Sequence, residues 1–332
     1  MPQSIASFFG NWWPGLLILV IVLVIVVVLF RPRNIDSLTS HPNPVKSYAE
    51  AVQRIDVLQA RGKNLNPLCQ ATLLTHGDKT DRVIIFVHGY TTCPQQFAEL
   101  GERFYDLGYN VLMLPVPHHG LADRMTDELG LITSEELAAY ADQVGDLAPG
   151  LGKYVVVAGI SMGGVITGWA AQNRSEVDLA VIMSPGFSFK PIPTSLTVLI
   201  ANIVVMLPVW YVWWDTTLKE KAGPPYAYPR FTYHGLGEIM RLGFAVRAAA
   251  QRTAPAARSI LVVTNANDTS VDNEVTAQMV QLWRDDHTTL ATYKFEKSLG
   301  LPHDMIDPNQ KGGNIKVVYP RLIDLINKQF LA

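Results

Sequence analysis

The residues best suited to chemistry in this chain form the hexapeptide Gly-Ile-Ser-Met-Gly-Gly at positions 159–164. A short, valine-rich apolar run at residues 154–158 precedes it and is typical of a buried parallel strand. Residues 165–172 can continue as a helix. Glycines on both sides of a serine let the backbone turn sharply between strand and helix, which leaves the serine hydroxyl exposed above the sheet. The pattern therefore predicts that Ser161 is a nucleophile.

A serine hydroxyl becomes a good nucleophile only when a base removes its proton, and the base works best when a carboxylate orients it. The reactive groups of a parallel sheet gather at the carboxyl ends of its strands. Two residues meet this condition: Asp268, which follows an expected strand at 260–264, and His303, which follows one at 291–295. The sequence thus predicts a triad in the chain order Ser161, Asp268, His303, which is typical of hydrolases.

Three other carboxylates compete for the role of the orienting group. Asp178 precedes its expected strand and would lie at the wrong end of the sheet. Asp272 begins an expected helix and is interpreted as its cap, so that it is the reserve candidate behind Asp268. Asp304 adjoins His303 and is expected to point elsewhere, as a carboxylate on the surface.

The negative charge that develops on an attacked carbonyl oxygen needs two preorganised backbone donors. One is expected to be the N–H of Met162, the residue after the nucleophile. The other is expected to be the N–H of Tyr90, in the loop that follows an apolar strand at 83–87. His88, in the same loop, is predicted to be structural, with its ring bonded to backbone.

These groups need a scaffold, and the pattern of apolar residues supplies one. Strand and helix patterns alternate along the chain after the amino-terminal segment, which predicts an α/β fold with a mainly parallel sheet and helices on both faces. The expected strands are residues 69–75, 83–87, 110–114, 154–158, 179–183, 260–264 and 291–295. The expected helices are residues 47–61, 94–107, 134–147, 165–172, 272–284 and 315–330.

An insertion of about 70 residues separates the strands at 179–183 and 260–264. Its residues 196–214 carry no charge and are interrupted by Asn202 and Pro208, so that hydropathy alone would predict a membrane span. A single crossing here would divide one sheet between two compartments, which unpaired sheet edges do not permit. The segment is therefore predicted to be a hydrophobic lid, with tryptophans suited to a membrane interface.

The amino-terminal segment looks like a membrane anchor. No charged side chain precedes Arg31, and the 19 residues 12–30 approach the ~20 needed to cross the hydrocarbon as a helix. A cleaved signal peptide normally has a positive first region and a small-x-small cleavage site, and neither is found. Basic residues lie only on the carboxyl side (Arg31, Arg33 and Lys46), so the positive-inside rule predicts a cytoplasmic catalytic domain.

Composition excludes several classes of function. The formal net charge of −2 and the lack of a basic stripe argue against nucleic acid as a partner. No cluster has the spacing of a metal site, and neither a metal nor a cofactor is expected. The two cysteines, Cys69 and Cys93, imply no disulfide framework. They are expected to be free thiols, and a bond between them is the alternative.

The motifs His88-Gly89, Gly159 to Gly164, Asp268 with Val271, and His303 resemble those of the α/β-hydrolase superfamily. The chain is most similar to its bacterial carboxylesterases and monoacylglycerol lipases, over about residues 70–331. The loop 117–120 resembles their Gly-His-Gly stretch, with His118 in place of the first glycine. The resemblance implies an α/β-hydrolase fold and a cap that shapes an acyl pocket, here longer and more apolar.

These observations predict a membrane-anchored serine hydrolase that cleaves carboxylic esters of monoacylglycerol or lysophospholipid type through an acyl-serine intermediate. Its partners would be an amphiphilic ester and the membrane, bound through residues 12–30 and the lid at 196–214. Thioesterase, amidase or acyltransferase chemistry with the same triad is the alternative, and a non-catalytic binding protein is a third. The predicted domains are an anchor (1–31), a tether with a surface helix (32–68), two core parts (69–186 and 259–332) and the lid segment (187–258).

Overall fold

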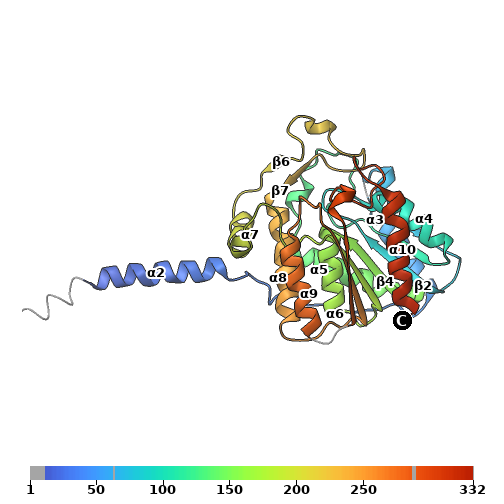
Figure 1. The fold of residues 1–332 in the computed structure, drawn as a ribbon, viewed down its shortest axis with the longest axis horizontal. Helices are drawn as coiled ribbons and strands as arrows, with labels where there is room; N and C mark the ends of the chain where they lie inside the picture. The colour runs from blue at the N-terminus through green and yellow to red at the C-terminus, as the bar shows by residue number, and fades with distance from the viewer. Residues whose placement is uncertain (1–11, 63, 286–288, 332) are drawn as a thin grey trace, which may run out of the picture.

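A seven-stranded, mostly parallel sheet lies at the centre of the computed structural model, which describes residues 12–62, 64–285 and 289–331 (Figure 1). The strand order is β1-β3-β2-β4-β5-β8-β9, and β1 alone runs antiparallel to its neighbour in this sheet. The strands are β1 (Thr72–Leu74), β2 (Thr80–Val87), β3 (Asn110–Met113), β4 (Gly152–Ile160), β5 (Leu179–Met183), β8 (Ser259–Asn265) and β9 (Thr289–Phe295). Each of the seven strands expected from the sequence is present.

The central strands are buried on both faces, which explains why their sequences are continuous apolar runs. In β2, Ile84 and Phe86 pack toward one face, while Val83, Ile85 and Val87 pack toward the other. Valine and isoleucine suit this environment because their branched side chains fit a pleated, covered surface.

Helices cover both faces of the sheet (Figure 1). The face of Ile84 is covered by α4 (Ala98–Asp106) and α10 (Ile315–Leu331). The face of Val83 is covered by α5 (Ser134–Leu151), α6 (Met162–Asn173), α8 (Tyr233–Ala250) and α9 (Asn273–Asp285), with α3 (Tyr48–Arg61) packed on α5. The expected two-faced α/β architecture is confirmed.

The lid segment between β5 and β8 has structure that the sequence pattern did not predict. It contains η4 (Thr194–Leu196), α7 (Thr197–Met206), β6 (Tyr211–Trp213), η5 (Lys219–Lys221), β7 (Arg230–Thr232) and all of α8. Strands β6 and β7 pair antiparallel in a separate two-stranded sheet. Within the described chain, the apolar stretch at 196–214 is thus a short helix followed by a strand, and α2 (Trp13–Phe30) is the one helix long and apolar enough to cross a membrane.

Helix α2 extends away from the body of the molecule (Figure 1). Its carboxyl end is held by the lid segment, because the buried Asn202 of α7 donates its Nδ2 to the carbonyl oxygens of Leu29 (2.7 Å) and Arg31 (2.9 Å). The last carbonyl oxygens of a helix have no N–H donor within that helix, so Asn202 of α7 acts as a carboxyl-terminal cap for α2. Residues 1–11 of the predicted anchor lie outside the described residues.

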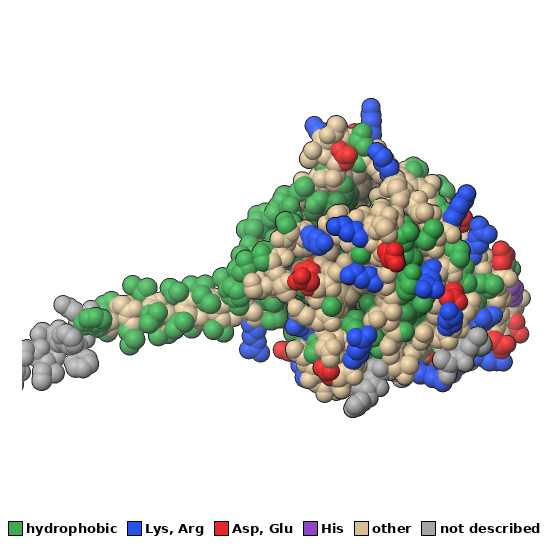
Figure 2. All heavy atoms as spheres, viewed as in Figure 1, with side chains coloured by type: hydrophobic (Ala, Val, Ile, Leu, Met, Phe, Trp, Pro, Cys, Tyr) green, Lys and Arg blue, Asp and Glu red, His purple; other side chains and the backbone are tan. Residues whose placement is uncertain are grey.

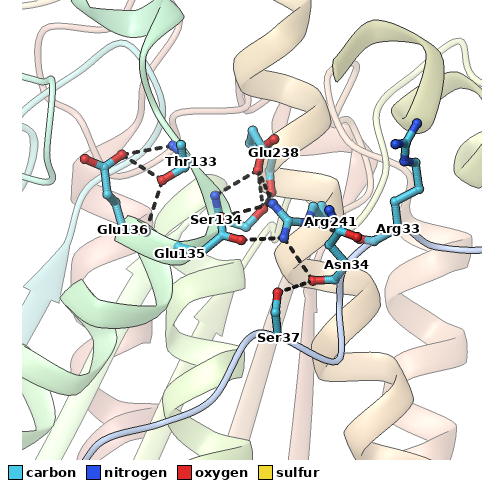
Figure 3. A network of polar contacts seen from close by, with 9 residues as sticks. All are labelled: Arg33, Asn34, Ser37, Thr133, Ser134, Glu135, Glu136, Glu238 and Arg241. Carbon is cyan, nitrogen blue, oxygen red and sulfur yellow. Dashed lines mark hydrogen bonds and ion pairs between the residues drawn. The ribbon is translucent and has the colours of Figure 1, made fainter. Parts of the chain in front are cut away.

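The tether after α2 is fixed by a polar network (Figure 3). Arg241 of α8 donates to the carbonyl oxygens of Arg33 (3.1 Å) and Asn34 (2.9 Å). The same guanidinium pairs with Glu135 of α5 and with Glu238. One side chain therefore joins the tether, the lid segment and the core.

Candidate active site

Ser161 occupies a sharp turn between β4 and α6. Its backbone has φ of 58° and ψ of −116°, and residues other than glycine rarely adopt a positive φ. The flanking glycines are needed because a Cβ on Gly159 would collide with the carbonyl oxygen of Gly163, and one on Gly163 with that of Val87. This is the strand–turn–helix geometry expected for an elbow that presents a serine hydroxyl.

Asp268 and His303 are brought together from the loops that follow β8 and β9. Atom Nδ1 of His303 lies 2.8 Å from Oδ2 of Asp268. The other carboxylate oxygen accepts the N–H groups of Ser270 (2.9 Å) and Val271 (3.2 Å). The Asp268 side chain is fully buried and His303 is mostly buried. A carboxylate fixed in this way holds an imidazole with Nδ1 as the donor and leaves Nε2 free to accept a proton.

The electrostatics of this pair suit a base and its orienting group. Burial opposes ionisation of Asp268, but the hydrogen bond and charge of His303, together with two amide donors, outweigh it and lower the pKa of Asp268. Burial likewise opposes the imidazolium of His303, but the hydrogen bond and charge of Asp268 outweigh it and raise the pKa of His303 above 6.5.

This shift sets the expected acid limb of the pH profile. The base must be neutral to take a proton, so kcat/KM for an ester is expected to fall as pH drops through the pKa of His303, with a midpoint above pH 6.5. Initial rates across pH, with the product quantified by chromatography, measure this midpoint. A midpoint below that value would contradict the base assignment.

Contacts around Gly89 connect Ser161 with the segment of His303. No hydrogen bond joins the Ser161 hydroxyl to His303 in the part of the chain that the structure describes. A Cβ placed on Gly89 would lie 3.5 Å from Cβ of Ser161, so the loop after β2 passes directly beside the serine. The same loop is tied through Gln96 to Asp304, the neighbour of His303.

Both predicted oxyanion donors are available. Neither the N–H of Met162 nor that of Tyr90 donates a hydrogen bond to another described residue. Met162 opens α6, where the first N–H groups of a helix lack partners inside the helix. The Tyr90 hydroxyl lies 3.0 Å from Oγ1 of Thr232, and burial raises its pKa, so this side chain is neutral and structural.

His88 has the structural role predicted for it. Its Nε2 accepts the N–H of Val116 (2.9 Å), so Nδ1 carries the proton and donates to the carbonyl oxygen of Gly89 (2.9 Å). Burial lowers the pKa of His88 to about 4, which keeps the ring neutral. His88 thus supports the loop that carries Tyr90.

Asp272, the reserve candidate for the orienting carboxylate, forms hydrogen bonds with other residues than His303. Asp272 precedes α9, and its Oδ1 accepts the N–H of Glu274 (2.8 Å) in the first turn of that helix. Its Oδ2 accepts the hydroxyl of Thr194 (3.2 Å). The carboxylate therefore caps α9, as the sequence indicated, while Asp268 holds His303.

The expectation that Asp304 is a surface carboxylate is wrong. Asp304 accepts Nε2 of the fully buried Gln96 (3.2 Å), and burial raises its pKa. Because the backbone N–H of Gly89 can only donate, Gln96 must turn its Oε1 toward Gly89 (2.8 Å), and its amide nitrogen then points at Asp304. Sequence reasoning missed Gln96, since no local pattern signals a contact between residues so far apart in the chain.

Removal of Gln96 is expected to lower kcat about 10-fold with little change in KM, because the Tyr90 donor would lose its fixed position. Steady-state rates of Gln96→Ala on a soluble ester measure this, with Gln95→Ala as the matched control on the outward side of the same turn. A raised KM with unchanged kcat would assign Gln96 to substrate binding instead.

The expectation of free thiols is also wrong. Cys69 and Cys93 form a disulfide that is fully buried. Cys93 follows the oxyanion loop directly, and Cys69 lies in η1 (Pro67–Cys69), which packs against η2 (Pro94–Phe97). The bond therefore ties the predicted oxyanion loop to the segment before β1. The two cysteines are 24 residues apart, and the fold rather than their spacing brings them together.

The lid segment rests on the same loop. Trp214 donates its Nε1 to the hydroxyl of Thr91 (3.0 Å), and the N–H of Tyr228 donates to the Thr91 carbonyl oxygen (2.7 Å). His118, in place of the expected glycine, also has a positive φ (65°) and is held by Glu128 and Glu136. Two hydrogen-bonded carboxylates thus support a conformation that a glycine would adopt without help.

Comparison with protein families gives one match. The family described as "Serine aminopeptidase, S33" matches residues 78–297, about two thirds of the 332-residue chain. No curated protein matches the chain in sequence.

Several solved structures share the architecture. One, from work on the metagenome-derived lipolytic enzymes LipS and LipT, has a TM-score of 0.58 at 18% identity and covers 80% of this chain and 99% of its own. A monoacylglycerol lipase from Paleococcus ferrophilus has a TM-score of 0.57 at 15% identity, and the match covers 78% of this chain and 98% of the lipase. A soluble variant of the Saccharomyces cerevisiae monoglyceride lipase has a TM-score of 0.58 at 13% identity, and the match covers 78% of this chain and 91% of the lipase. The predicted α/β-hydrolase fold is confirmed.

Proposed function

Because the chain belongs to the S33 serine aminopeptidase family of α/β hydrolases, we propose that it is a membrane-anchored serine hydrolase that cleaves carboxylic esters. Ser161 attacks the ester carbonyl, His303 takes its proton and returns it to the leaving alcohol, and Asp268 orients the imidazole. The N–H groups of Met162 and Tyr90 stabilise the oxyanion. Water then releases the acid from acyl-Ser161. The observation that carries the proposal is the His303–Asp268 hydrogen bond at the same end of the sheet as the strained Ser161 turn.

Membrane anchoring is supported by the exposed apolar surface. Helix α2 has a mean hydropathy of 3.2 and no buried residue, which would be costly in water. Hydrophobic side chains continue from α2 onto the adjoining lid segment (Figure 2). Those of the lid include Met206 (60% exposed), Leu207 (45%), Trp210 (38%) and Trp214 (50%). An apolar patch beside a spanning helix, rich in tryptophan, fits the boundary between headgroups and acyl chains.

The proposed substrates are amphiphilic esters of monoacylglycerol or lysophospholipid type. Such molecules partition into the layer in which the apolar lid would lie, so anchor and lid together hold the predicted site where the substrate concentrates. The lipases among the similar structures support this class.

Amide hydrolysis is the second candidate, and the family's description as aminopeptidases favours it. The same triad cleaves esters, thioesters and amides, because all pass through a tetrahedral oxyanion. A panel of monoacylglycerols, lysophospholipids, acyl-CoAs and aminoacyl amides separates these chemistries. Highest kcat/KM on the lipid esters is expected. Activity on the amides alone would overturn the substrate class, and no labelling by a fluorophosphonate would overturn the hydrolase itself.

Two observations bear on the side of the membrane that holds the catalytic domain. The basic residues Arg31, Arg33 and Lys46 favour the cytoplasm. The buried Cys69–Cys93 disulfide favours an oxidising compartment, because cytoplasmic thiols are kept reduced. The orientation rule depends here on only three residues, whereas the disulfide is fully buried and joins two segments of the core. We therefore propose that the domain faces the oxidising side.

On this proposal, protein denatured directly from intact cells is expected to resist alkylation by a maleimide reagent until a reductant is added. Both cysteines are then expected to react, giving a shift for two labels on a gel. A Cys69→Ser/Cys93→Ser variant supplies the unlabelled control. Labelling without reductant would place the domain in the cytoplasm, as the basic flank predicts.

A further inference from the structure

A cavity that the predicted triad does not line lies at the base of the anchor. It encloses about 300 Å³ and is lined by the tether, the start of α7, α8 and α9. Most of its wall is apolar, formed by Ile35, Phe187, Val198, Phe244, Val275 and Met279. Ser161, Asp268 and His303 do not line it. It is therefore a separate site rather than part of the proposed acyl pocket.

The cavity also contains a cation without a partner. Arg247 of α8 lines it, is only half-exposed, and forms no ion pair or side-chain hydrogen bond with any described residue. Gln251, one turn later, lines the same cavity, and its amide is likewise unpaired among the described residues. A position in the last turn of α8 suits a cation. The helix position does not explain why the Arg247 guanidinium borders an apolar cavity. A half-buried charge is stable only when it is paired or hydrated.

The position of the cavity indicates what completes it. Pro32 and Ile35, which line it, follow the end of α2 at Phe30 by only a few residues. If α2 spans the bilayer, the cavity lies at the level of the headgroups. Arg31 and Arg33 are exposed beside it, while the nearby acids Glu135 and Glu238 are paired with Arg241 (Figure 3). Asp36 lies 4.0 Å from Arg252. Asp272, which accepts the hydroxyl of the lining residue Thr194, forms no ion pair with a described residue. Three cations without an ion-pair partner among the described residues (Arg31, Arg33 and Arg247) therefore outnumber this one carboxylate near the cavity.

We propose that this cavity binds one anionic phospholipid of the surrounding leaflet, with the lipid phosphate on Arg247 and Gln251 and one acyl chain along the apolar wall. A phosphate accepts strong, charge-assisted hydrogen bonds from a guanidinium. The basic residues near the membrane surface select an anionic headgroup over a zwitterionic one. The inference rests on the proposed membrane anchoring, but not on the proposed hydrolysis.

The test uses the full chain in nanodiscs of phosphatidylcholine with a minor fraction of phosphatidylglycerol. After mild detergent extraction, native mass spectrometry counts the phosphatidylglycerol retained per protein. The wild type is expected to retain one molecule, and Arg247→Gln about tenfold less, as befits the loss of one charge-assisted contact. Arg247→Lys is expected to recover part of the loss, and Val198→Trp, which fills the cavity, to abolish retention.

The matched control is Arg258→Gln, which removes an exposed cation that precedes β8, does not line the cavity and forms no ion pair with a described residue. This variant is expected to retain lipid as the wild type does. Equal retention by Arg247→Gln and the wild type would overturn the proposal. Displacement of the lipid by inorganic phosphate alone would overturn the acyl-chain part. Fluorophosphonate labelling and resistance to carbonate extraction, measured on the same samples, show separately whether hydrolysis and anchoring hold.

Discussion

Replacing Ser161 with alanine is expected to lower kcat/KM for a lipid ester by on the order of 10⁴- to 10⁶-fold and to abolish fluorophosphonate labelling. Without the hydroxyl, no acyl-enzyme can form, and only binding and the oxyanion donors remain to assist water. Hydrolysis of monoacylglycerol by the purified full chain, followed by chromatography of the released fatty acid, measures the loss.

Ser184 supplies the matched control for this variant. It is a fully buried serine directly after β5, the strand beside β4, and its hydroxyl has no hydrogen-bond partner among the described residues. Ser184→Ala is expected to keep most of the activity. Labelling that persists in Ser161→Ala, or that disappears in Ser184→Ala, would show that the nucleophile has been misassigned.

A stability measurement separates lost chemistry from lost folding. The φ of 58° at Ser161 costs about 1–3 kcal/mol for a residue with a side chain. Glycine adopts this conformation freely, so Ser161→Gly is expected to be as inactive as Ser161→Ala but to melt at a higher temperature.

Replacing Asp268 with asparagine is expected to lower kcat by about 10⁴-fold. The amide nitrogen of asparagine would donate to Nδ1 of His303, which places the imidazole proton on Nε2, where the Ser161 proton has to go. The lost negative charge also lowers the pKa of His303, so the acid limb of any remaining activity is expected to move to lower pH. Rate profiles across pH measure both effects.

Asp272→Asn is the control for Asp268→Asn, because Asp272 is a nearby carboxylate that caps α9 instead of holding His303. It is expected to reduce the melting temperature slightly and to leave kcat within about threefold, as the loss of a cap implies. A larger loss of kcat in Asp272→Asn than in Asp268→Asn would reverse their assigned roles.

The sheet could be predicted from the sequence because its strands are buried on both faces. Such strands are short runs of branched apolar residues, as in β2 and β5, and these runs are distinctive in one dimension. The Asp268–His303 contact was predictable for a related reason. A parallel sheet brings the carboxyl ends of its strands to one edge, so residues just after β8 and β9 must lie near each other.

The lid segment and the supporting contacts could not be predicted in the same way. Residues 196–214 are apolar throughout, so periodicity could not separate α7 from β6. The contact of Gln96 with Asp304 and the pairing of Cys69 with Cys93 depend on how distant segments pack. Separation along the sequence carries no information about such contacts. The two expectations that were wrong, the free thiols and the surface position of Asp304, therefore both concern packing rather than local structure.

The cap that Asn202 places on α2 has a mechanical consequence. If α2 spans the membrane as proposed, the two peptide oxygens that Asn202 caps lie at the edge of the hydrocarbon. They would lose their donor if α7 swung away from α2, which is costly where water is scarce. On the proposed anchoring, any movement of the lid segment is then expected downstream of α7, in the stretch that contains Pro208, while α7 keeps its contact with α2. The predicted active site would then keep a constant height above the proposed bilayer, and lipid substrates would arrive by lateral diffusion within the leaflet rather than from bulk solution.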